Sequence, residues 1–356
     1  MKDKLRFFDK VTFLVLVAIA LLGILLIYSA SADLESKYYL KQLVRLAFSI
    51  LCLFLVLMID TRKIMEVAFP IYVVLVIILA LQAVLGTVMS GTRSWIKVGF
   101  LFIQVSEFIK IFTALCLARY LAKIKIIGWK SLLVILLYVG IPFALIAQQP
   151  DLGTAFMLCS LVLTAVFLKG IRPMVVVLSL LALVAVSYVG VKHVLKPYQK
   201  ARLVSFLNPH KYEQSSGYQV IQSKIAIGSG GVSGRGFLKG SQTRYRFLPT
   251  RHTDFIVSVL GEEFGFLGVT VLLFLFFVFF FRQLDVNIPV RDEFYFTYLF
   301  TGIILFQFLI NILMTIGLFP VLGIPLPFVS YGGSSLLAFF IGEGMIFRIR
   351  INRFLP

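Results

Sequence analysis

Charged residues are scarce in this sequence. They make up 14% of its 356 residues, against about 25% in soluble domains. Acidic residues are the scarcest, with 16 against 34 lysines and arginines, so the net charge is +18. Hydrophobic residues make up 60% of the chain. This composition excludes an ordinary soluble domain and indicates a polytopic membrane protein.

Cysteine is also rare, and the positions of its three residues argue against both a disulfide-stabilised and a zinc-stabilised fold. Cys52, Cys116 and Cys159 lie in apolar stretches and have no metal-ligand spacing. Neither a disulfide framework nor a zinc site is therefore predicted. The first apolar run lacks a cleavage site of small residues, so we expect it to be a retained membrane helix rather than a removed signal peptide.

Long apolar runs dominate the rest of the chain. Because a membrane helix needs about 20 apolar residues, we predict about ten transmembrane helices in an all-α fold. The predicted spans are residues 11–30, 41–59, 68–86, 104–121, 131–148, 153–169, 173–191, 255–281, 295–316 and 331–347. We treat residues 1–356 as a single integral membrane domain.

The distribution of lysine and arginine predicts the topology. Short loops on one side hold most of these cations, which places both termini in the cytoplasm by the positive-inside rule. The long loop between the seventh and eighth spans, residues 192–252, is then extracytoplasmic although it is basic. Its cations are consistent either with recruitment of a phosphate-bearing substrate or with contact to anionic membrane lipid. Nucleic acid is not a predicted partner.

Ionisable residues inside predicted spans are candidates for function, because burying charge in a bilayer is costly. Glu107 and Lys110 are three residues apart, so they share a helix face in the fourth span, as a functional pair or as a packing ion pair. Asp151 is expected to cap the sixth span. We expect Glu343, in the last span, to make a buried hydrogen bond.

Asp254 lies where the long loop meets the eighth span. An aspartate at this boundary can either cap the helix or carry out chemistry among the loop cations. Glu262 and Glu263 fall at the outer edge of the same span. Glycines 228, 230 and 231 in the loop can bring backbone N–H groups close to an anion, although such turns are weak evidence on their own.

The segment between the last two spans is rich in proline, glycine and serine. Its three prolines, at 320, 325 and 327, prevent a continuous helix, and Ser330 with the following glycines offers polar groups at a helix start. Irregular backbone at membrane depth must face protein or a wet cavity. We expect that cavity beside Asp254.

Five motifs together resemble the SEDS family (shape, elongation, division and sporulation), whose members are peptidoglycan glycosyltransferases. The motifs are QVSEFIK, QQPDLGT, SKIAIGSGG, HTDFIVSVLGEEFG and GIPLPFVSYGGSSLL, and the resemblance covers essentially the whole chain. The short N-terminus and GSQTRYRFLPTRHTDF are more similar to the elongation branch than to the division branch. Thr250 and Val105 depart from the family pattern, which usually has Glu and Pro there.

The resemblance implies polymerisation of lipid II into glycan strands at the outer face of a bacterial cytoplasmic (inner) membrane. It implies that Asp254 is essential, that Glu107 and Lys110 act as a pair, and that Gln199 and Ser241 are associated with activity. It also implies a partner, a class B penicillin-binding protein that supplies the transpeptidase.

The chemistry of that reaction suggests roles for the residues. A base must take a proton from the attacking sugar hydroxyl, and cations must stabilise the departing undecaprenyl diphosphate. We assign Asp254 as the base, with Glu107 and Lys110 orienting it or the acceptor. The candidate substrate contacts are Gln199, Arg202, Ser241, Arg246, Arg251 and Ser330. No cofactor is predicted; a carboxylate cluster can hold Mg²⁺, but no ligand spacing requires it.

Two other functions fit a ten-helix membrane protein. A flippase for lipid-linked cell-wall precursor needs polar groups on both sides of the membrane midplane, whereas most of the ionisable groups in these spans fall near the outer side. A non-catalytic scaffold for cell-wall enzymes does not need such a cluster.

Overall fold

Helices form most of the computed structural model, which describes residues 7–32, 34, 37–85, 87–89, 92–98, 101–175, 206, 216–284 and 288–353. The helices are α2 (Lys10–Ala30), α3 (Tyr38–Met58), α4 (Thr61–Leu85), α5 (Val105–Lys123), α6 (Trp129–Gln148), α7 (Leu152–Lys169), α10 (Ser216–Gly230), α11 (Ser241–Arg244), α12 (Ile256–Leu284), α13 (Arg291–Thr315) and α14 (Gly333–Asn352). They coincide with nine of the ten predicted spans. The other predicted span, 173–191, lies outside the described residues from position 176 onward.

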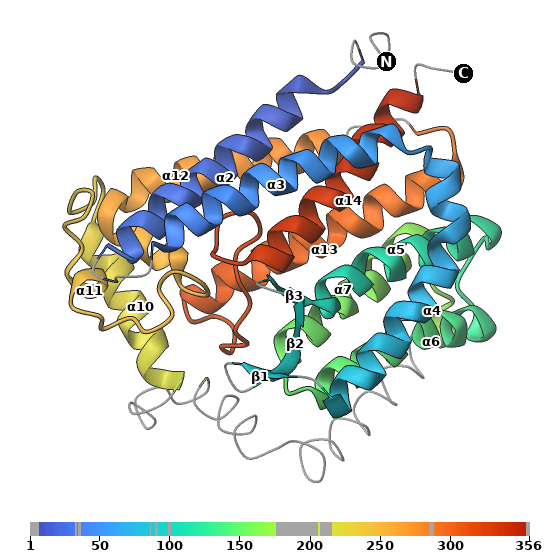
Figure 1. The fold of residues 1–356 in the computed structure, drawn as a ribbon, viewed down its shortest axis with the longest axis horizontal. Helices are drawn as coiled ribbons and strands as arrows, with labels where there is room; N and C mark the ends of the chain where they lie inside the picture. The colour runs from blue at the N-terminus through green and yellow to red at the C-terminus, as the bar shows by residue number, and fades with distance from the viewer. Residues whose placement is uncertain are drawn as a thin grey trace.

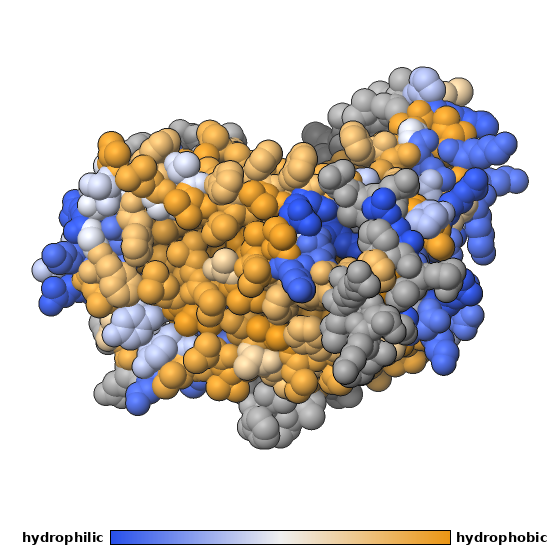
Figure 2. Space-filling model, turned by 90° about the horizontal axis from the view of Figure 1, so that it is seen from above, coloured by the Kyte–Doolittle hydropathy of each residue, from blue (hydrophilic) through white to orange (hydrophobic). Residues whose placement is uncertain are grey.

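Seven of the described helices are long and apolar enough to cross a membrane: α2, α3, α4 over Thr61–Gln82, α6, α7, α12 and α13. Figure 2 shows one face of the molecule as a broad hydrophobic area, with hydrophilic residues toward both ends and a smaller group of them near its middle. Helices α5 and α14 differ because they carry several charged residues. They can do so because most of their side chains are buried against other helices rather than facing lipid.

A small sheet corrects the prediction of a purely α-helical fold. Strands β1 (Thr87–Met89), β2 (Thr92–Val98) and β3 (Leu101–Gln104) form an antiparallel sheet in the order β1-β2-β3. Their sequences are rich in Thr, Val, Ile and aromatic residues, which favour strands, but they are too short to stand out beside the long apolar runs. Strand β3 runs directly into α5 and so fixes where that helix begins.

The segment between α13 and α14, residues 317–332, folds back among the helices (Figure 1). A Cβ at Gly23 of α2 would lie 2.5 Å from the main-chain oxygen of Val329. Gly23 is seven residues before the end of α2, which corresponds to about 10 Å along a helix. The irregular backbone therefore enters the bundle and is covered by protein, as its depth requires.

Helices α10 and α11 lie at one end of the molecule, and the start of α2 and the end of α14 lie at the other (Figure 1). Helix α10 packs against α12 and α13. The described part of the predicted loop 192–252 is thus folded onto the helix bundle. This arrangement puts the loop and the two helix ends on opposite sides, whichever side faces the cytoplasm.

Candidate functional site

Asp254 lies in the turn that leads into α12, two residues before that helix begins. It is half-buried. The main chain around it is held from two directions. The Ser330 hydroxyl donates to the Thr253 carbonyl at 2.5 Å, and the Tyr331 N–H donates to the His252 carbonyl at 3.0 Å. The 317–332 segment therefore fixes the backbone immediately before Asp254.

Asn311 of α13 fixes the backbone at Asp254 itself. Its side-chain amide donates to the Asp254 carbonyl at 2.9 Å and to the Ile324 carbonyl at 2.7 Å, and the residue is fully buried. Asn311 is not among the residues predicted from the sequence. The available signal was an amide inside an apolar span, which is costly unless it is hydrogen-bonded.

Glu107 and Lys110 form the predicted pair in the first turns of α5. Lys110 Nζ lies 2.9 Å from Glu107 Oε2, and the two side chains are only 2% and 7% exposed respectively. The ammonium also lies 5.2 Å from the centre of the Phe339 ring of α14. A buried, charged pair is thus held between α5 and α14.

Asp151 caps α7, as predicted, by accepting a hydrogen bond from the Thr154 N–H at 3.1 Å. Its other oxygen accepts from the Gln104 side chain at 2.8 Å. Burial raises the pKa of Asp151, and the nearby Glu107 charge adds to that rise while Lys110 opposes it. Asp151 therefore lies within electrostatic range of the pair on α5.

Asp254 and the region just after Asp151 both adjoin the same short segment, residues 322–324. A Cβ at Gly323 would lie 3.7 Å from Asp254 Oδ2. A Cβ at Gly153, two residues after Asp151, would lie 2.7 Å from the Leu322 carbonyl oxygen. The fold thus brings Asp254 and the 151–154 region to one loop although they are distant in sequence, and Gln104 joins the start of α5 to Asp151.

The candidate substrate contacts differ in their surroundings. Arg246 is exposed, whereas Arg251 is 4% exposed and donates through Nε to the Ala30 carbonyl at 2.6 Å. Ser330 is also buried. Ser241, at the start of α11, accepts a hydrogen bond from Arg235 at 2.7 Å. Gln199 and Arg202 lie outside the described residues.

His252 packs its ring on Tyr38 with 5.0 Å between centroids. Burial, together with the adjacent charge of Arg251, lowers the pKa of His252. The imidazole beside Asp254 therefore stays neutral at neutral pH.

Glu262 and Glu263 serve the fold around the long loop. The fully buried Glu262 carboxylate accepts from the Gln242 N–H at 2.7 Å and from the Thr243 hydroxyl at 2.8 Å, so it caps α11. Glu263 accepts from the Ser29 hydroxyl at the end of α2. Both glutamates tie the loop to the helices.

One of the three loop glycines suggested for an anion, Gly230, instead approaches helix backbone, whereas a Cβ at Gly228 or Gly231 would meet no atom within 4 Å. Gly230 and Gly234 face α12 so closely that a Cβ would lie 1.9 Å from the Gly261 oxygen and 2.1 Å from the Glu263 oxygen, respectively. A sequence signal for helix packing rather than anion binding is the presence of further glycines, 261 and 265, on α12.

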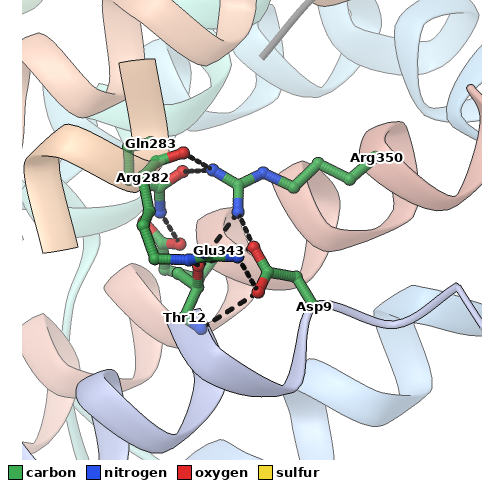
Figure 3. Close-up of polar contacts among 6 residues, drawn as sticks. All are labelled: Asp9, Thr12, Arg282, Gln283, Glu343 and Arg350. Atoms are coloured by element: carbon green, nitrogen blue, oxygen red, sulfur yellow. Dashed lines mark hydrogen bonds and ion pairs between the residues drawn. The ribbon is translucent and has the colours of Figure 1, made fainter. Parts of the chain in front are cut away.

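A second polar cluster lies at the opposite end of the molecule (Figure 3). Arg350 donates to Asp9, to the Arg282 carbonyl at 2.6 Å and to the Gln283 side chain at 2.9 Å. Gln283 in turn donates to Glu343, which confirms the expected buried hydrogen bond of that residue. These contacts join α2, α12 and α14.

Packed phenylalanines lie between the two polar regions. Phe328 of the 317–332 segment contacts Phe279, Phe339 and Phe340, with ring centroids 5.4–6.0 Å apart. All four are buried. Phe328 is two residues before Ser330 and Phe279 is three residues before Arg282, so these rings pack between parts of the two polar regions.

The chain matches a known family over nearly its full length. The family model FTSW_RODA_SPOVE, described as cell cycle protein, matches residues 9–354. Peptidoglycan glycosyltransferase RodA of Treponema pallidum is 33% identical, over 97% of this chain and 98% of the relative. Peptidoglycan glycosyltransferase MrdB of Escherichia coli K12 is 33% identical, over 99% and 97%. A probable peptidoglycan glycosyltransferase FtsW of Coxiella burnetii is 37% identical over 92% of each.

Solved structures share the fold. A chain of a peptidoglycan synthase complex, described by its coordination of polymerization and crosslinking, matches with a TM-score of 0.85 at 30% identity, covering 98% of this chain and 99% of that one. The rod shape determining protein RodA of Thermus thermophilus matches with a TM-score of 0.74 at 27% identity, covering 98% of each. The chain therefore belongs to the FtsW, RodA and SpoVE family of cell cycle proteins, the SEDS family that its motifs resemble.

Proposed function

We propose that this protein is a peptidoglycan glycosyltransferase that polymerises lipid II into β-1,4-linked glycan strands during cell elongation. The observation that carries the proposal is the Asp254 turn, which α13 and the 317–332 segment hold in place. Relatives that match nearly the full length of the chain are named peptidoglycan glycosyltransferases. The active site faces the extracytoplasmic side, with both termini in the cytoplasm.

The reaction joins two lipid-linked sugars. A hydroxyl oxygen of the acceptor attacks the anomeric carbon of the donor, and the bond from that carbon to undecaprenyl diphosphate breaks, leaving its electron pair on the diphosphate. Asp254 takes the hydroxyl proton as general base. Attack opposite the leaving group converts an α linkage to a β linkage without a covalent enzyme intermediate.

Glu107 and Lys110 orient the acceptor or the base. Their ion pair is nearly inaccessible to solvent, so its geometry is well defined. The hydrogen bond from Gln104 to Asp151 joins the starts of the fourth and sixth predicted spans beside this pair.

The cations of the loop stabilise the departing diphosphate. Arg246 is the best candidate for direct contact because its side chain is exposed. Arg202, Gln199 and Ser241 are further candidates. Arg251 and Ser330 make hydrogen bonds to main-chain carbonyls, which suits them to holding the loop in place.

A class B penicillin-binding protein is the proposed partner. The similar chain in the solved synthase complex belongs to an assembly that couples polymerization and crosslinking. A glycosyltransferase that makes uncrosslinked strands needs such a transpeptidase to complete the wall.

The packed phenylalanines favour an enzyme over a flippase. A flippase needs a route for a polar head group across the midplane, and among the described residues buried aromatic rings of α12, α14 and the 317–332 segment pack against one another between the two polar regions. The polar cluster at the far end is internally paired, which suits a structural role.

Replacing the proposed base tests the function directly. Asp254→Asn should lower polymerisation of labelled lipid II by at least about a hundredfold, because a general base contributes that much or more. Product length is read on a gel after incubation with purified protein. Asp60→Asn, which neutralises an exposed aspartate elsewhere in the chain, is the matched control and should leave the rate unchanged. Long strands made by Asp254→Asn would exclude this base.

The ion pair on α5 is tested by Lys110→Ala. Removing the lysine leaves Glu107 buried without its partner, so both activity and thermal stability should fall. Lys110→Arg restores the charge and should recover stability. Normal turnover per folded molecule in Lys110→Ala would reduce the pair to a packing role.

A further inference from the structure

A cavity lies between α4, α5 and α6. These three helices pack against one another (Figure 1). Its volume is about 220 Å³, and its lining residues are Phe69, Cys116, Arg119, Tyr120, Lys123 and Tyr138. Twelve residues of α5 separate Arg119 from Glu107, which corresponds to about 18 Å along the helix. The cavity is therefore distinct from the candidate site.

The cavity lies toward the end of the bundle that holds the start of α2 and the end of α14. Thr61, at the start of α4, accepts a hydrogen bond from Asn352 near the end of α14 at 2.9 Å. Arg119 donates through Nη1 to the Met65 carbonyl, one turn further along α4, at 2.8 Å. In the proposed topology this is the cytoplasmic end.

Two cations give the cavity its charge. Arg119 is half-buried and Lys123 is exposed. The ion pairs made by the described residues include neither of them, and Glu66 on the adjoining face of α4 is within 4 Å of neither. One nitrogen of Arg119 is engaged by Met65, so its remaining N–H groups and the Lys123 ammonium form a positive edge.

Aromatic rings line the rest of the cavity. Phe69 and Tyr138 meet edge to face with 6.4 Å between centroids, and Phe69 is 50% exposed. The Tyr72 hydroxyl donates to the Tyr138 carbonyl at 2.9 Å, which joins α4 to α6 beside the cavity. Rings with one apolar side and one polar edge are typical of the zone where lipid head groups meet hydrocarbon.

We propose that this cavity binds the phosphate head group of an anionic phospholipid from the cytoplasmic leaflet. Arg119 and Lys123 contact the phosphate oxygens, and the aromatic rings cover the glycerol region. The acyl chains lie along the exposed apolar side chains of α4 and α6, such as Val67 and Leu137. Basic pockets between membrane helices on this side are suited to such head groups. The site is additional to the proposed glycosyltransferase and uses only its proposed orientation.

Lipid binding by variants of the full chain tests this assignment. The purified protein is titrated with fluorescent phosphatidylglycerol in nanodiscs of phosphatidylcholine. Each cation near anionic lipid contributes roughly a fivefold gain in affinity, so Arg119→Gln with Lys123→Gln should weaken binding about 25-fold. The matched control, Lys125→Gln with Lys130→Gln, removes two exposed cations from the same end outside the cavity and should change binding less than twofold.

Because Arg119 also holds the Met65 carbonyl, Lys123→Glu alone provides a second test that leaves that contact intact. It should weaken binding of phosphatidylglycerol and leave thermal stability unchanged. Equal loss in the control pair, or no loss in either cavity variant, overturns the proposal. Displacement of the lipid by millimolar inorganic phosphate would assign the cavity to a free anion instead. The readout does not depend on polymerisation, so the result is independent of the proposed enzyme activity.

Discussion

At the scale of single residues, Asn311 shows how one amide can hold the backbone of the proposed base. Its two N–H donors satisfy the carbonyls of Asp254 and Ile324, so α13 holds the turn before α12 and the 317–332 segment in one register. Gln307, one turn earlier on α13, donates to the Pro325 carbonyl at 2.8 Å. The two amides hold the same segment, but only Asn311 also holds Asp254.

This difference gives a matched pair of variants. Asn311→Leu should lower kcat strongly with a small change in KM, because the Asp254 backbone loses its support while the exposed substrate contacts remain. Leaving two buried carbonyls without donors should also cost about 2–4 kcal/mol of stability. Gln307→Leu should lower thermal stability with a much smaller loss of kcat. Equal kcat losses in both variants would show that Asn311 acts only through the segment.

At the scale of elements, helix α12 is interrupted by Gly265, whose φ of 64° and ψ of −158° are not helical. Main-chain groups of the loop replace the missing helical hydrogen bonds. Arg235 and Gly236 donate to the Glu262 and Glu263 carbonyls at 3.0 Å each. The Phe266 and Leu267 N–H groups donate to the carbonyls of residues 231 and 232 at 2.9 and 3.1 Å. The loop that precedes Asp254 is thus joined to the helix that follows it.

Adding a methyl group at Gly265 should push the loop away from α12. A Cβ at Gly265 would lie 2.4 Å from the Gly234 nitrogen, and the backbone conformation there favours glycine. Gly265→Ala should therefore reduce polymerisation and cost about 1–3 kcal/mol from backbone strain alone. Gly228→Ala, at an exposed helical glycine with no atom within 4 Å, is the control and should be neutral or slightly stabilising. Wild-type activity and melting temperature in Gly265→Ala would contradict this account.

At the scale of the whole molecule, the polar cluster drawn in Figure 3 lies at the end of the bundle opposite the candidate site. Asp9 caps α2 and pairs with Arg282 and Arg350, so the three helices are joined where they end. Partial burial alone would raise the pKa of Asp9, but hydrogen bonds from Thr12 and Arg282 and the Arg350 charge outweigh it and lower the pKa below its usual 3.8.

The pH dependence of stability follows from the lowered pKa of Asp9. A carboxyl whose folded pKa is below its unfolded value stabilises the fold above the unfolded pKa and loses this contribution as pH falls through the folded value. Asp9→Asn should therefore lower the melting temperature at pH 7, since Arg350 is left buried with a weaker partner. The difference from wild type should shrink as the pH falls below 3.8. Thermal unfolding in detergent at pH 3–7 measures it, and a constant difference would rule out this role for the Asp9 charge.

The sequence by itself determined the family and the helices that coincide with nine predicted spans. Hydrophobic runs of membrane length place helices within a few residues, because apolar side chains must face lipid or protein over the full bilayer thickness. The Asp254, Glu107 and Asp151 motifs were visible because charge is costly inside such runs. The Asp151 cap and the Glu107–Lys110 pair are local contacts, three residues apart, so helix geometry alone predicts them.

Only the tertiary structure decided which distant residues meet. Asn311, Gln104 and Asp9 act through partners far away in the sequence, and no periodic pattern specifies those partners. The same holds for the loop glycines, whose use depends on the helix they approach. The short strands before α5 were not predicted from the sequence. Their local preference for strand structure is weak, and the surrounding packing decides whether such a segment forms a strand. Local forces choose the elements, whereas their contacts depend on how the bundle closes around the 317–332 segment.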